Sequence, residues 1–130
     1  MQEWFFAFKD GTTIFNPLLK KGFGHVFVFS IIGDRIFVVN PHRSFIELIN
    51  ISSYDKQFPD IKEVIEEIKK NGAVVVRAKI EPDIKERCLE VKNMFPSCVN
   101  LAKMVSCYRS WSQTPYQLYN SLLKNGAERI

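Results

Sequence analysis

The chain has 130 residues, the size of one globular domain, and 46% of them are hydrophobic and 25% charged. This balance excludes a disordered chain, and no apolar run approaches the roughly 20 residues that a membrane span requires. The net charge of +4, with no run of five like charges, does not favour nucleic-acid binding. No signal peptide is recognisable, so we expect one cytoplasmic domain over residues 1–130, without membrane contact.

The clearest strands lie in the first half of the chain. Residues 25–32 and 35–40 are rich in Val, Ile and Phe, and Pro41 ends the second run. Gly33 and the Asp after it form a two-residue loop of the kind that a type II′ turn prefers. A third strand is expected over residues 45–51. Because the hairpin is apolar on both faces, we expect it to lie centrally in a sheet covered on both sides.

Helix signals dominate the second half of the chain. Asp60 is a suitable N-cap, Glu63 follows at capping-box spacing, and Gly72 is placed to end that helix. The other expected elements are a strand over residues 73–80, a segment 81–95 that suits either a helix or a strand, a helix over 98–107, and a last helix opened by Thr114 and Pro115. The expected fold class is α+β, a mostly antiparallel sheet of about four strands with packed helices.

Two aromatic groups allow more than one interpretation. Residues 4–8 are almost all aromatic or apolar but too few to assign, and they form either core or a subunit contact; if exposed, they would mark an interface. Tyr108, Arg109 and Trp111 could stack on a base or a sugar, although a loop packed on the sheet is the simpler interpretation.

The three cysteines point to reactivity or packing rather than to cross-linking. Cys88, Cys98 and Cys107 are odd in number and lack the spacing of a zinc cluster, so we expect no disulfide scaffold, metal or cofactor. Cys98 falls in the first turn of a predicted helix, where unpaired N–H groups stabilise a thiolate. Each thiol is therefore either a small buried hydrophobe or a nucleophile.

The hairpin register brings polar side chains together near the start of the first long strand. With a two-residue loop at 33–34, the numbers of cross-strand partners sum to 67, so Phe27 pairs with Asn40 and His25 with His42. His25 and Asn40 are then diagonal neighbours on one side of the hairpin. The Asn40 carbonyl could orient the imidazole, and His42 is its rival for that role. With Cys98 these residues compose a Cys-His-Asn arrangement of nucleophile, base and orienting group.

The order of these motifs resembles a known family. The residues are Gly-Phe-Gly-His-Val at 22–26, Asn40 followed by Pro41, Cys98 followed by Val99, and Thr-Pro-Tyr-Gln-Leu-Tyr at 114–119. They are similar to the circularly permuted papain-like fold of the NlpC/P60 superfamily, in which the His strand precedes the Cys helix. The likeness is greatest to small proteins of tailed bacteriophages and prophages, and it covers residues 23–123.

The resemblance implies a function and a site. It implies Cys98 as nucleophile, His25 as base and Asn40 as third polar residue of a hydrolase or transferase acting on amide, thioester or ester bonds. The partner would be a peptide or another amide or ester substrate, in the cytoplasm of a bacterial host. The alternative is an inactive papain-like virion or assembly component that binds phage structural proteins.

Overall fold

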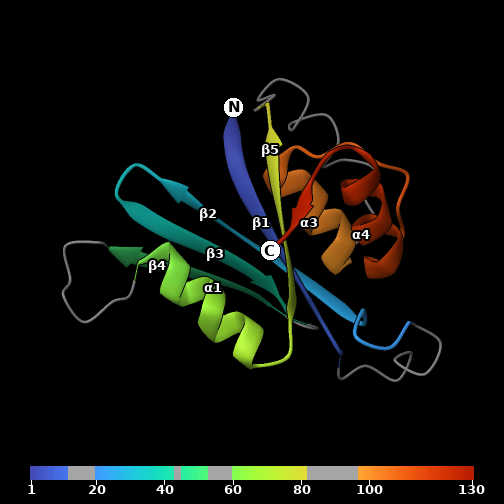
Figure 1. Cartoon of the computed structure of the whole chain (residues 1–130), viewed down its shortest axis with the longest axis horizontal. Coiled ribbons are helices and arrows are strands. Elements are labelled where there is room, and N and C mark those ends of the chain that lie inside the picture. Colours follow the sequence, from blue (N-terminus) through green and yellow to red (C-terminus); the bar gives the residue numbers. More distant parts are fainter. Residues whose placement is uncertain (12–19, 43–44, 53–59, 82–96) are drawn as a thin grey trace.

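A six-stranded antiparallel sheet forms the centre of the computed structural model, which describes residues 1–11, 20–42, 45–52, 60–81 and 97–130 (Figure 1). The strand order is β4-β3-β2-β1-β5-β6. The predicted α+β class is confirmed, with six strands instead of about four. The strands are β1 (Gln2–Lys9), β2 (His25–Ile32), β3 (Arg35–Pro41), β4 (Ile46–Ser52), β5 (Val74–Ile80) and β6 (Glu128–Arg129), and the described helices are α1 (Ile61–Lys70), α3 (Cys98–Ser106) and α4 (Pro115–Lys124).

β1, for which the sequence pattern gives no assignment, lies in the middle of the sheet. β1 pairs with β2 on one side and β5 on the other, and Phe6 lies opposite both Val28 and Val76. Trp4 and Phe6 are 5% and 0% exposed, so the aromatic run is core and not an exposed interface. A strand buried on both faces has no polar alternation, which is why its pattern was ambiguous.

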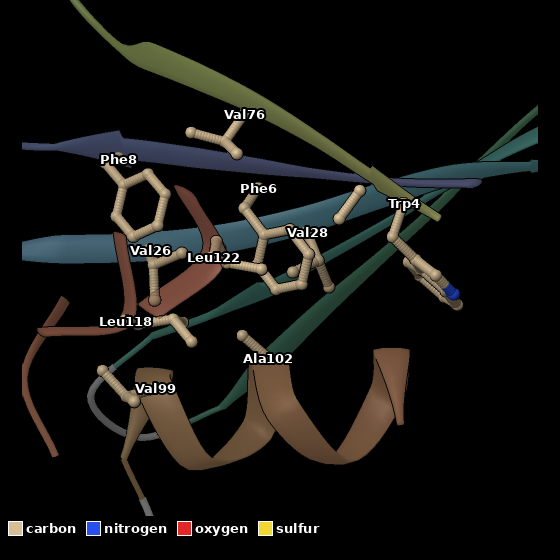
Figure 2. Packing of buried hydrophobic residues seen from close by; sticks show 11 residues of the cluster. Trp4, Phe6, Phe8, Val26, Val28, Val76, Val99, Ala102, Leu118 and Leu122 are labelled. Atoms are coloured by element: carbon tan, nitrogen blue, oxygen red, sulfur yellow. The ribbon is translucent and has the colours of Figure 1, made fainter. Parts of the chain in front are cut away.

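Apolar clusters cover both faces of the sheet, as the two-sided hairpin predicted. α3 and α4 lie on one face and α1 on the other (Figure 1). The cluster beneath α3 and α4 is seen in Figure 2, where Val99 and Ala102 of α3 point toward the aromatic side chains of β1. Its buried members are Trp4, Phe6, Phe8, Val26, Val28, Val76, Ala78, Val99, Ala102, Leu118 and Leu122. The cluster on the α1 face is built around Phe5, Ala7, Phe27, Phe29, Ile36, Val38 and Val75.

Local signals set the turn and the helix ends where they were expected. Gly33 has φ +66°, as the first central residue of a type II′ turn requires, and the β2–β3 partners sum to 67, as in Val28 opposite Val39. Asp60 accepts a hydrogen bond from the Glu63 backbone N–H at 3.0 Å, which caps α1. Thr114 forms a capping box with Gln117 at the start of α4.

One expected segment falls outside the described part of the chain. Residues 82–96 are not described, so Cys88 and almost all of the ambiguous segment 81–95 lie outside the described residues. Directly after this segment, Ser97 caps α3 by accepting from the Asn100 N–H at 3.1 Å. The helix ends at Ser106, one residue short of the expected bound, because Cys107 adopts a left-handed conformation with φ +63°.

Candidate functional site

The His25 ring is held by Asn40. His25 is the first residue of β2 and Asn40 lies near the end of β3, and the atoms His25 Nε2 and Asn40 Oδ1 are 2.8 Å apart. This is the diagonal pair that the hairpin register predicted. Because Nε2 contacts the amide, Nδ1 is the ring nitrogen left to accept a proton from a nucleophile.

Glu47 of the edge strand β4 contacts the other end of the Asn40 amide. Asn40 lies opposite Glu47 of β4, and its Nδ2 donates to Glu47 Oε1 at 3.3 Å. The rival orienting residue, His42, has its Nε2 3.7 Å from the same Glu47 oxygen and stacks on Phe45 with ring centroids 4.4 Å apart. Asn40, and not His42, therefore forms the hydrogen bond to the His25 ring. Glu47 was missed, although it is the one charged residue in the predicted strand 45–51.

Cys98 approaches the same end of the sheet from the other direction. It is the first residue of α3, and the backbone N–H groups of Val26, Val99 and Cys98 itself lie near its sulfur. Val99 and Ala102, on the same helix, are 1% and 2% exposed in the cluster of Figure 2, and this packing seats α3 on β2. The peptide that the sulfur contacts on β2 directly follows His25.

Pro41 explains why the pairing of β2 and β3 ends before Val26. Ile32 and Arg35 flank the turn and form the first hydrogen-bonded pair of the hairpin. In an antiparallel pair of strands, hydrogen-bonded positions recur at every second residue. This alternation assigns Val26 to an exchanging position opposite Pro41, which has no N–H to return. The paired positions of β2 and β3 accordingly stop at Val28.

The thiol and the ring reach this point from different faces. Val26 belongs to the cluster beneath α3, whereas Phe27 belongs to the cluster on the α1 face. Side-chain alternation assigns His25 to the face of Phe27. Within the described residues no hydrogen bond joins the Cys98 sulfur to a His25 nitrogen. The structure thus brings His25 to Asn40, and Cys98 to the backbone beside His25.

Burial keeps both reactive groups in their neutral forms. Desolvation raises the pKa of the Cys98 thiol above its ordinary value, against the opposing effect of the backbone N–H donors of Val26, Val99 and Cys98. Desolvation also lowers the pKa of His25; the bond to Asn40 opposes this shift, and the charges of Lys9 and His42 add to it. Near pH 7 the pair is therefore a thiol and a neutral imidazole.

The other candidate side chains lie elsewhere. Tyr108 packs edge-on against Phe6, with ring centroids 6.3 Å apart, as expected of a loop packed on the sheet. Trp111 is 96% exposed beside an open hollow that Asn120 and Lys124 also line. Cys107 is half-buried at the end of α3.

In the described ranges, no three His, Cys, Asp or Glu side chains gather as metal ligands. None of the described helices is long and apolar enough to cross a membrane. Compared with known proteins, the chain matches no family model, no curated protein and no solved structure.

Proposed function

We propose that this protein is a cysteine hydrolase or transferase of the permuted papain-like kind, acting on an amide or ester bond. Cys98 is the nucleophile, His25 the base and Asn40 the residue that orients the base. One observation carries the proposal: two consecutive residues of β2 contact the two halves of the site. His25 bonds to Asn40 at 2.8 Å, and the Val26 N–H lies near the sulfur of Cys98, which packs against the same cluster as Val26.

The neutral pair defines the first chemical step. The proposed step requires the His25 ring to come within reach of the thiol from the other face of β2. As the Cys98 sulfur attacks the carbonyl carbon, His25 Nδ1 takes the thiol proton and the carbonyl π electrons move to oxygen. The backbone N–H of Cys98, at the start of α3, stabilises the oxyanion. The His25 imidazolium then protonates the departing amine or alcohol as the carbonyl re-forms, which leaves a thioester on Cys98. Water or an acceptor amine releases the acyl group and regenerates the thiol.

A chromogenic ester tests the proposal without knowledge of the natural substrate. We expect p-nitrophenyl acetate to release nitrophenolate with a burst and to leave an acetyl group on Cys98, found by mass spectrometry of peptides. The matched variants Cys88→Ala and Cys107→Ala should keep the burst, and Cys98→Ala should lose it. His25→Gln should slow acylation by about 10²–10⁴-fold at pH 7, the usual contribution of a general base. Equal labelling of all three cysteines, unaffected by His25→Gln, would refute the proposal.

A second candidate is a papain-like binding module without turnover. The observation that favours it is the edge strand β4, where Ile46 and Leu48 are 53% and 74% exposed. An edge strand with apolar side chains in solvent is suited to accept a strand from a partner such as a phage structural protein. Leu48→Lys would abolish capture of that partner, whereas Cys98→Ala would preserve it. Loss of function in Cys98→Ala but not in Leu48→Lys would instead support catalysis.

A further inference from the structure

Asn40 has two different neighbours, one on each side of its amide. Its Oδ1 lies 2.8 Å from His25 Nε2, and its Nδ2 lies 3.3 Å from Glu47 Oε1. An ionised carboxylate only accepts hydrogen bonds, so it requires the NH₂ end of the amide. With Glu47 on one side, the oxygen of Asn40 is left for His25.

The direction of this amide decides where the His25 ring carries its proton. A carbonyl oxygen only accepts, so Nε2 must donate to it, and the neutral ring must carry its proton on Nε2. The basic lone pair then resides on Nδ1. If the Asn40 amide were reversed, its NH₂ would face Nε2 and favour the opposite tautomer, in which Nδ1 carries the proton and cannot act as a base.

We propose that Glu47 is a positioning residue of the site: its carboxylate fixes the Asn40 amide, and the amide fixes His25 as the Nε2–H tautomer. The meaning of this for catalysis rests on the proposed function, whereas the tautomer itself does not. The three residues come from three neighbouring strands, β2, β3 and β4, and Glu47 lies directly opposite Asn40 in the register. The edge strand thereby contributes to the site through a side chain that reaches no substrate.

Nitrogen NMR tests the tautomer directly. The chain has two histidines, so uniformly ¹⁵N-labelled protein gives two sets of ring signals, which His42→Gln assigns. At about pH 8, above the ordinary pKa of His, the wild-type His25 ring should show a protonated Nε2 and an unprotonated Nδ1. Glu47→Gln, whose amide can also donate, and Glu47→Ala, which offers no acceptor, should shift His25 toward a mixture of tautomers.

Glu3→Gln is the matched control. Glu3 is also a strand carboxylate in an ion pair, 3.4 Å from Arg77, and its side chain is 42% exposed, as is that of Glu47. This variant should leave the His25 ring signals unchanged. Unchanged signals in both Glu47 variants, with wild-type folding by circular dichroism, would overturn the proposal.

The ester assay on the same samples separates the two proposals. If only half of the His25 rings carry the proton on Nε2, the rate of Cys98 acylation should be halved, since only that tautomer leaves Nδ1 free to act as a base. Acylation in the wild type with no tautomer shift in the Glu47 variants refutes the positioning role and leaves the function standing. A clear tautomer shift with no acylation in the wild type refutes the function and leaves the positioning of the ring.

Discussion

Trp4→Ala should destabilise the protein strongly, because Trp4 belongs to the central strand and is 5% exposed. A buried tryptophan removes about 200 Å² from water, which at about 25 cal/mol/Å² corresponds to about 5 kcal/mol. Measured Trp→Ala changes in cores fall at about 3–5 kcal/mol. With an unfolding entropy of about 2.1 cal/mol/K per residue, a loss of about 4 kcal/mol lowers the Tm of this 130-residue chain by roughly 15 °C.

The chain contains its own control for this change. Its one other tryptophan, Trp111, is 96% exposed, so Trp111→Ala makes the same substitution with almost no loss of buried surface and should change stability by less than about 0.5 kcal/mol. Urea unfolding followed by circular dichroism gives both values. In Trp111→Ala the remaining fluorescence comes from Trp4 alone and should shift to the red on unfolding. Similar losses from the two variants would refute the placement of β1 at the centre of the sheet.

Three further predictions concern the hairpin and the site. Because the pKa of His25 is lowered in the folded state, protonation favours unfolding, and the free energy of unfolding should fall as the pH drops below about 6.5. In urea unfolding measured at several pH values, His25→Gln should lack this decrease. Because the pKa of Cys98 is raised, its contribution should fall as the pH rises through about 9.0, and Cys98→Ser should remove it. Gly33→Ala should cost about 1–2 kcal/mol in the same measurement, because φ is +66° although a methyl group would meet no atom within 4 Å.

Features set by short stretches of sequence were predictable. The turn at Gly33 fixes the β2–β3 register, and the register in turn makes His25 and Asn40 diagonal neighbours. The N-caps at Asp60 and Thr114 depend on residues three positions apart. Each of these predictions required only local spacing, and each is confirmed.

Features set by distant pairing were not predictable. β1 becomes central only because residues 74–80 pair with it, and nothing within residues 4–8 announces that partner. Glu47 meets Asn40 only once the β3–β4 register is known, because the sequence His-Arg-Ser-Phe at 42–45 carries no turn signal comparable to Gly33 and Asp34. The position of the Cys98 sulfur near the Val26 N–H depends on where α3 docks, which is decided by packing of Val99 and Ala102 over the sheet.

The directions of the two pKa shifts distinguish how the proposed site would work. If Cys98 and His25 formed a thiolate–imidazolium pair at rest, the pKa of the thiol would be lowered and that of the ring raised; burial shifts both in the opposite directions. In the proposed reaction the proton therefore stays on sulfur until a carbonyl is attacked, with His25 as the proposed general base. Ester acylation should rise with an apparent pKa below 6.5 and then stay level to about pH 9. A rate that climbs with thiol ionisation alone, without the first rise, would show that the ring takes no part.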